Sequence, residues 1–159
     1  MITQSESMNK PQFLKYKIGP KLTGIGNLSK ILAIQAFTSA KLNITPEQFS
    51  VLSVLVENGC LYQRQISALT LKDRPNVSRI LTILEGMGYV TKTPDVEKRK
   101  VVKITITQKG LDIYKEALPI ILQAWIDTVE EVSDYELDVF DSVLGKIKEN
   151  LLSKVNIQI

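Results

Sequence analysis

Residues 73–107, DRPNVSRILTILEGMGYVTKTPDVEKRKVVKITIT, contain the pattern that decides the fold. The first part predicts a helix from Arg74 to Met87, with Asp73 as its N-cap and Gly88 as its end. Apolar residues recur on one face of this helix at intervals of three and four: Val77, Ile80, Leu81 and Leu84. The second part predicts two strands, 89–92 and 101–106, joined by a charged, turn-prone loop. The stretch therefore predicts a helix followed by a β-hairpin that extends beyond the core.

Two helices are expected near the N-terminus. The first runs from Pro20 to Lys41, after an arm of about fifteen residues that lacks periodicity and is expected to be frayed or partly ordered. The second begins at the capping sequence Thr45-Pro46-Glu47-Gln48 and ends at Asn58-Gly59. Its buried stripe is expected to consist of Phe49, Leu52, Leu55 and Val56.

A short helix is expected from Arg64 to Leu71, with Ile66 and Leu69 facing inward. Together with its neighbours it gives the order helix, short helix, longer helix and β-hairpin. This order is the layout of a winged helix-turn-helix, in which the second helix of the pair enters the major groove of DNA and the hairpin reaches along the backbone. The predicted fold class is therefore mainly α with a small β-hairpin wing.

The distribution of charge agrees with that layout. The chain of 159 residues has a net charge of only +3, with 20 basic and 17 acidic residues. Residues 64–103, however, carry nine basic side chains against four acidic ones, whereas residues 111–159 carry four against ten. A basic middle beside an acidic C-terminal third indicates a polyanion-binding segment on a scaffold that does not itself touch the polyanion.

The face of the 74–87 helix opposite its apolar stripe offers groups that hydrogen-bond to base edges and phosphates. Asparagine pairs with adenine, arginine with guanine or phosphate, and serine or threonine with either. The candidate DNA-binding residues are Arg74, Asn76, Ser78, Arg79 and Thr82 on the helix, and Lys98, Arg99 and Lys100 on the wing. Ordinary helix-start chemistry is the alternative interpretation for Asn76 and Ser78. A solvated surface is the alternative for Arg79 and the wing.

The C-terminal third is expected to form two helices. One runs from Thr107 to about Glu131 with a kink at Pro119, and the other opens at the capping box Ser133-Asp134-Tyr135-Glu136 and continues through Val155. Their apolar residues exceed what one small winged domain can cover, so a second copy of the chain is expected to bury them. The candidate dimerisation residues are Trp125, Phe140, Leu144, Ile147 and Leu151.

Five short segments and the charged wing through Arg99 resemble the multiple-antibiotic-resistance regulator (MarR) family of transcription factors. In order, the segments are Leu42–Phe49, Gln65–Leu69, Asn76–Arg79, Leu84–Val90 and Ile106–Gly110. Their order and spacing over about seventy residues carry the resemblance, which with the flanking helices covers most of the chain. In the wing, Glu97-Lys98-Arg99 looks like the counterpart of the family's Asp-x-Arg.

The resemblance implies one domain over residues 1–159, with a winged helix-turn-helix at 42–107. Helices at 16–41 and 108–155 would then build a two-fold homodimer, which would bind a pseudo-palindromic operator in double-stranded DNA. It further implies a transcriptional regulator, expected to be a repressor that a small-molecule effector relieves by binding between the dimer helices and the winged domain.

The composition excludes several other classes. With no histidine, triad hydrolases and histidine-based metal sites are excluded, so neither an enzyme nor a metal or other cofactor is expected. A single cysteine excludes an internal disulfide and a four-cysteine zinc site. Neither an apolar stretch of membrane-spanning length nor a secretory signal is visible, so a cytoplasmic protein without a membrane partner is expected.

Two alternative functions stay open at this point. A winged helix can serve as a protein-interaction module without binding DNA, although the basic segment favours DNA. Cys60 could make the chain a thiol-based redox sensor, although a purely structural cysteine is favoured because Arg64 is its nearest basic residue in sequence.

Overall fold

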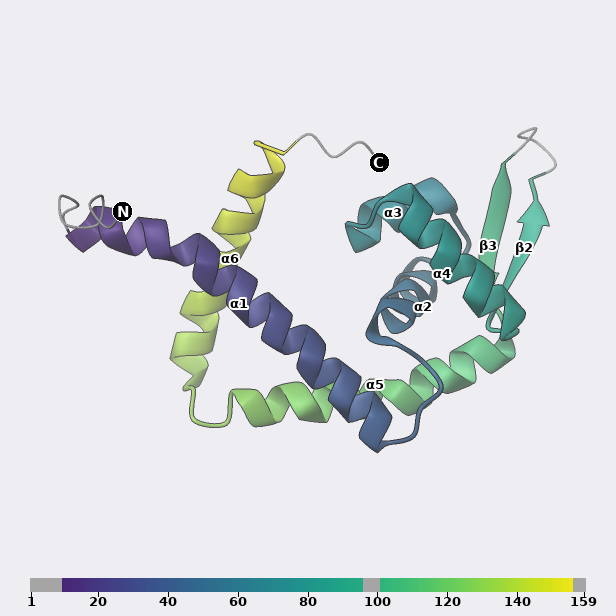
Figure 1. The fold of residues 1–159 in the computed structure, drawn as a ribbon, viewed down its shortest axis with the longest axis horizontal. Coiled ribbons are helices and arrows are strands. Elements are labelled where there is room, and N and C mark those ends of the chain that lie inside the picture. Colours follow the sequence, from purple (N-terminus) through teal and green to yellow (C-terminus); the bar gives the residue numbers. More distant parts are fainter. Residues whose placement is uncertain (1–9, 96–100, 156–159) are drawn as a thin grey trace, which may run out of the picture.

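The computed structural model of the chain describes residues 10–95 and 101–155, and its elements divide into two regions (Figure 1). We call residues 44–107 the reading head, which contains three helices and a small sheet. We call the long helices around it the helical frame, which comprises α1, α5 and α6. In chain order the elements are α1 (Lys10–Ser39), α2 (Pro46–Asn58), β1 (Leu61–Tyr62), α3 (Gln63–Thr70), α4 (Arg74–Gly86), β2 (Val90–Pro94), β3 (Val102–Ile106), α5 (Gln108–Thr128) and α6 (Asp134–Leu152).

The helix starts lie where the capping residues predict them. Thr45 and Gln48 form a reciprocal capping box at α2, and the Asp73 carboxylate accepts a hydrogen bond from the backbone N–H of Asn76 at α4. Ser133 caps α6 with Glu136, and the hydrogen bonds from Ser133 lower the pKa of that glutamate. The predicted mainly α fold with a hairpin wing is confirmed.

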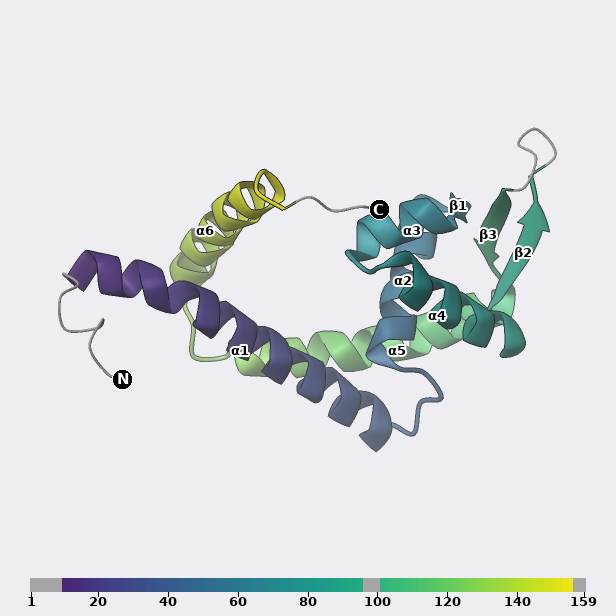
Figure 2. The same ribbon diagram turned by 45° about the horizontal axis from the view of Figure 1, so that its top comes forward.

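The sheet has three strands in the order β1-β3-β2, all antiparallel (Figure 2). β2 and β3 form the predicted hairpin, with a register that runs from Val90 opposite Ile106 to Pro94 opposite Val102. β1 was not predicted. Its two residues pair with the opposite edge of β3, with Leu61 facing Ile104, and so connect the hairpin to the start of α3.

Most of the core lies in the reading head, and Ala33 and Phe37 of α1 and Ala117 and Ile121 of α5 complete it. All four apolar residues of the α4 stripe are buried, together with residues from α2, α3 and the sheet: Val51, Leu52, Leu55, Ile66, Tyr89, Val90 and Ile104. Two expectations about this core are wrong. Val56 is 36% exposed and Leu69 is 49% exposed, because Val51 and Ser67 occupy the inward positions on α2 and α3.

α1 begins ten residues before its expected start at Pro20. It is one helix from Lys10 to Ser39, so residues 10–15 of the arm that was expected to be frayed or partly ordered belong to this helix. Pro20 removes one backbone donor but the helix continues through it, as a helix does when neighbouring turns hold it in line. Pro119 is likewise inside α5. Among the described residues, no helix is both long enough and apolar enough to span a membrane.

Candidate nucleic-acid interface

α4 has one buried face and one exposed face. Val77, Ile80, Leu81 and Leu84 turn into the core, so the opposite side of the helix is on the surface of the reading head (Figure 1). The structure therefore brings the five predicted groups of this helix to the surface, with Asn76 half-buried and the other four exposed: Arg74, Asn76, Ser78, Arg79 and Thr82.

The start of α4 orients two of these side chains. Because Asp73 already accepts the backbone N–H of Asn76 at 2.8 Å, the side-chain amide of Asn76 is not used as the cap. Its Oδ1 instead accepts a hydrogen bond from Nη2 of Arg79 at 3.4 Å. Asp73 is thus the residue that caps the helix. The amide of Asn76 and the guanidinium of Arg79 lie side by side at the surface.

Thr82, farther along the exposed face, makes a hydrogen bond within the helix. The hydroxyl of Thr82 donates to the backbone carbonyl of Ser78 at 3.0 Å, one turn earlier. Such a bond within one helix satisfies the hydroxyl in the free protein and can be exchanged for a bond to a ligand.

The turn between α3 and α4 fixes the direction of the exposed face. Leu71 adopts a left-handed backbone conformation, with φ 52°, at the end of α3. The side chain of Gln63, at the start of α3, donates to the backbone carbonyl of Arg74 at 3.1 Å. The two helices are therefore joined at both the turn and the far end of α3, which makes them one rigid unit.

The wing adjoins this unit. Its base is described, and the backbone N–H of Asp95 donates to the carbonyl of Val101 at 2.9 Å beyond the last strand pair. The three predicted wing residues, Lys98, Arg99 and Lys100, lie outside the described residues. Their contact with DNA therefore stays a prediction.

Three lysines between residues 92 and 109 already have partners within the chain. Lys92 forms an ion pair with Glu85 at 2.7 Å, and Lys103 lies 3.5 Å from Asp95. Lys109 donates to the carbonyl of Met87 at 2.8 Å and lies above the ring of Tyr89. The basic charge of this segment thus partly stabilises the junction of α4 with the sheet.

Arg64 is an exposed basic residue that is not among the predicted DNA-binding residues. It lies in the first turn of α3, on the helix that precedes the recognition helix. Helix starts favour phosphate contacts, so a basic residue in this turn was the signal that could have identified it.

The helical frame leaves large apolar side chains at the surface. Phe140 is 50% exposed and Leu151 is 53% exposed, Trp125 is exposed, and Leu144 and Ile147 are half-buried. In the described part of the chain, no residue of α6 is fully buried. Figure 2 shows α6 standing away from the reading head, so this helix has little core of its own chain to join.

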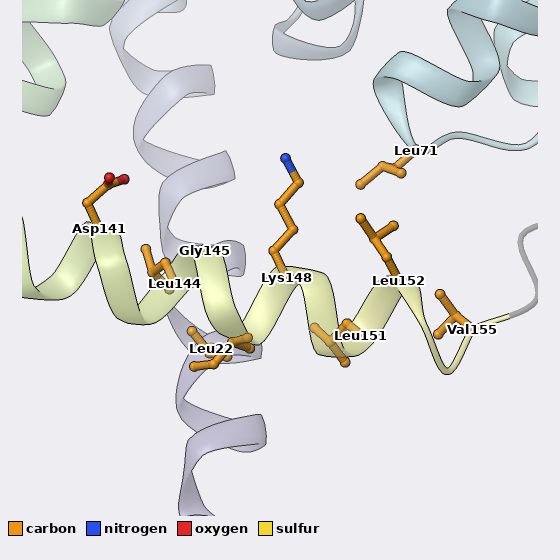
Figure 3. Close-up of a pocket in the computed structure, with 10 residues that line it drawn as sticks. Leu22, Leu71, Asp141, Leu144, Gly145, Lys148, Leu151, Leu152 and Val155 are labelled. Carbon is orange, nitrogen blue, oxygen red and sulfur yellow. The ribbon is translucent and has the colours of Figure 1, made fainter.

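Two apolar grooves run along the frame. One, of about 650 Å³, is bounded by α1, the end of α5 and Phe140. The other, of about 630 Å³, lies between α6 and Leu22 of α1, and Leu71 of the α3–α4 turn closes its far end (Figure 3). Asp141 and Lys148 provide charged groups along this second groove, whose remaining lining is apolar.

Two other site hypotheses have little geometric support. Cys60 is exposed between α2 and β1, and its reactivity stays untested. In the described ranges, 10–95 and 101–155, no group of three or more acidic or cysteine side chains gathers in a way that could hold a metal ion.

Part of the chain matches the model of a known protein family. Residues 44–102 match the family model described as MarR family. The transcriptional regulator FarR of Neisseria gonorrhoeae is 29% identical over 110 residues, which are 69% of this chain and 67% of FarR. The regulator YybA of Bacillus subtilis is 29% identical over 58% of this chain and 63% of its own length. The chain thus aligns with about two thirds of these relatives.

Solved structures with low sequence identity share the fold. BpsR of Bordetella bronchiseptica, whose DNA binding is regulated by 6-hydroxynicotinic acid, is 21% identical with a TM-score of 0.76 over 83% of this chain and 98% of BpsR. A cysteine-to-serine mutant of Escherichia coli MarR complexed with operator DNA is 18% identical, also at 0.76, over 82% and 93% of the two chains. The organohalide-sensing regulator RdhR bound to 2,4-dichlorophenol is 20% identical, at 0.82, over 98% and 89%.

Proposed function

We propose that this chain, whose residues 44–102 match the MarR family model, is a homodimeric regulator of transcription of that family and binds double-stranded DNA. The observation that carries the proposal is the two-sided α4. One side of it is packed into the core, and the other presents Asn76 and Arg79 next to each other. This is the arrangement by which a recognition helix reads base edges in the major groove.

Each exposed group of α4 has a defined role in this proposal. Asn76 and Arg79 hydrogen-bond to base edges, and Ser78 and Thr82 bond to bases or phosphates, Thr82 once the bond of its hydroxyl to the backbone carbonyl of Ser78 is exchanged. Arg74, at the first position of the helix, contacts the backbone beside the helix N-terminus. Lys98, Arg99 and Lys100 of the wing add phosphate or minor-groove contacts.

A second copy of the chain supplies the other half of the interface. The exposed apolar residues of α1, α5 and α6 are what an isolated protomer leaves unpaired, and a two-fold partner buries them. In domain terms, residues 42–107 read DNA, and residues 16–41 and 108–155 join the two copies within one domain of residues 1–159. Two recognition helices related by the two-fold axis address a pseudo-palindrome with half-sites about 34–36 Å apart.

We further propose that a small molecule relieves repression. The 630 Å³ groove in Figure 3 lies between α6 and α1, borders the proposed dimer interface and ends at Leu71 of the α3–α4 turn, so an occupant would act on the position of the recognition helix. Its leucine lining suits an apolar or aromatic ligand, and Lys148 suits an anionic group on it. BpsR and RdhR, which share the fold, are regulated by or bound to small aromatic molecules. The proposal includes no catalytic activity, and it places the protein in the cytoplasm with its target DNA.

Titration of labelled duplexes with the purified chain tests DNA binding. The probes are the DNA upstream of its own gene and a scrambled duplex of equal length. We expect Arg79→Ala to weaken binding to the upstream duplex by about 1–3 kcal/mol, concentrated at one base position, because a base-reading arginine is lost. Lys115→Ala, an exposed basic change on α5, is the matched control and should leave affinity unchanged. A folded, dimeric wild-type chain that prefers neither duplex at low salt would instead support the protein-interaction alternative.

The wing is tested by salt dependence. Replacing Lys98 and Arg99 together with alanine should reduce the slope of log affinity against log salt, since each phosphate contact contributes nearly one unit to it. An unchanged slope would show that the wing does not touch DNA.

A further inference from the structure

Asp95 is a buried carboxylate at the base of the wing. Its side chain is only 2% exposed. The phenol of Tyr62 donates a hydrogen bond to Oδ2 at 2.5 Å, and Nζ of Lys103 lies 3.5 Å from Oδ1. A buried carboxylate is costly unless donors compensate it, so this cluster depends on its geometry.

The three residues come from three different strands. Tyr62 is on β1, Lys103 is on β3 and Asp95 follows directly after β2, in a sheet whose order is β1-β3-β2 (Figure 2). Tyr62 and Asp95 therefore belong to opposite edges of the sheet, about 9–10 Å apart at the ordinary strand spacing. The phenol ring bridges that distance across β3, and Lys103, which pairs with Tyr62 in the ladder, joins the same cluster.

This hydrogen bond lies where the sheet becomes narrower. β1 supports β3 only at Leu61 and Tyr62, so the ladder beyond Lys103 consists of β2 and β3 alone. Two-stranded ribbons twist strongly and are marginally stable by themselves. The direction in which the wing extends from the three-stranded part of the sheet is therefore set at its last connection to β1.

The same tyrosine is joined to the helix-turn-helix. Tyr62 directly precedes α3, and its backbone N–H donates to the side chain of Gln65 at 2.9 Å. Gln63, the first residue of α3, is bonded in turn to the start of α4. A short chain of contacts thus connects the base of the wing with the start of the recognition helix.

We propose that Tyr62 and Asp95 are positioning residues that fix the angle between the wing and the recognition helix. Neither needs to touch DNA. The hydrogen bond between them holds the two-stranded part of the wing in one direction, so that wing and helix engage the same duplex together. The proposal rests on the proposed function, because it assumes that α4 and the wing both contact DNA.

Tyr62→Phe is the sharpest test, since it removes one oxygen and keeps the ring. We expect the variant to stay folded and dimeric by circular dichroism and sedimentation. Its affinity for the upstream duplex should fall about three- to tenfold, and the salt slope should become shallower, because correctly placed wing contacts are lost. Tyr135→Phe, which changes an exposed tyrosine of α6, is the matched control and should leave both quantities unchanged.

A double-mutant cycle separates positioning from general destabilisation. When Lys98 and Arg99 are already alanine, Tyr62→Phe should cost almost no further affinity, because the wing no longer contributes. A general loss of folded protein would instead lower affinity equally in both backgrounds with an unchanged salt slope, and that result overturns the proposal. So does full affinity of Tyr62→Phe in a wild-type wing. If the wild-type chain itself does not bind the duplex, it is the proposed function that fails.

Discussion

The reading head buries its apolar residues within the chain, whereas α6 of the helical frame leaves its apolar residues at the surface. In the head, Val51, Leu52, Ile66 and Val77 are fully buried by residues of the same chain. In the frame, α6 has no buried residue and Phe140 is half exposed, although the helix has an equally clear apolar periodicity. Periodicity predicts that a face will be buried, but not by which chain. The contrast indicates that the head forms one core with the parts of α1 and α5 packed on it, whereas α6 needs a second copy.

The largest expected effect, loss of the dimer and of DNA binding, comes from a charge placed on the apolar face of α6. Leu144 lies near the middle of the α6 stripe, and Leu144→Asp puts a carboxylate where the partner chain would pack. An uncompensated buried charge costs about 3–5 kcal/mol, so sedimentation should show monomer or unfolded chain. DNA binding should collapse although no DNA-facing residue changed, because a single head holds only one half-site.

Leu69→Asp is the control for that change. Leu69 is a leucine on the head that is 49% exposed, more so than the half-buried Leu144, and its replacement should leave the dimer intact. A dimeric Leu144→Asp protein with full DNA affinity would contradict the distinction between the two regions.

The second prediction concerns close packing in the head. A Cβ at Gly110, near the start of α5, would lie 2.1 Å from the backbone carbonyl oxygen of Tyr89, which cannot retreat because it accepts the N–H of Thr107. We expect Gly110→Ala to lower the free energy of unfolding by about 3 kcal/mol in denaturant titrations at fixed protein concentration.

Gly86 provides the matched glycine in the same region. A Cβ there meets nothing within 4 Å, so Gly86→Ala should change stability by less than about 0.5 kcal/mol. Equal effects of the two substitutions would show that Gly110 does not pack closely against the backbone of Tyr89.

The third prediction is a gain in stability. The hydroxyl of Ser67 is fully buried, and it has no hydrogen-bond partner within the described part of the chain. Ser67→Ala removes an uncompensated polar group from an apolar core, so the free energy of unfolding should rise by about 1 kcal/mol. Ser78→Ala on the exposed face of α4 should leave stability nearly unchanged. A destabilised Ser67→Ala protein would mean that the hydroxyl is satisfied after all.

The smallest effect should come from the ion pair that joins the two regions. Lys30 of α1 lies 2.6 Å from Glu47 of α2, and its hydrogen bond is the main reason that the pKa of Glu47 is below the ordinary value for a glutamate. A depressed pKa contributes stability above the ordinary value and loses it as the pH falls through the folded value. Because Lys30 is more than half exposed, the contribution should be under about 1 kcal/mol.

Thermal unfolding between pH 6 and pH 3 measures that contribution, on a range chosen around the ordinary glutamate pKa of about 4.3. Glu47→Gln should unfold at a slightly lower temperature than the wild type at pH 6, and the difference should disappear as the pH falls below about 4. A difference that stays constant over this range would assign the effect to packing rather than to charge.

Interactions between residues close in sequence were sufficient to predict most of the helices and strands. A helix start needs only a side chain that bonds to a backbone N–H three residues later, so Thr45, Asp73 and Ser133 were identified correctly as caps. The buried stripe of α4 and the two strands of the hairpin follow from periodicity in the same way. For the candidate site, the pattern identified the exposed face of α4. It did not identify Arg64, because a surface arginine outside that helix has no distinguishing spacing.

The sequence by itself thus determined the order of the elements, the caps and the two faces of α4, since each depends on residues within one or two turns of one another. Only the tertiary structure decided that Leu61 and Tyr62 form a third strand, that Leu69 faces outward, and that Asp95 is buried against a tyrosine 33 residues away. These outcomes depend on contacts between residues distant in sequence. Two residues are too few to show a strand period, and a carboxylate becomes buried only when another segment brings donors to it.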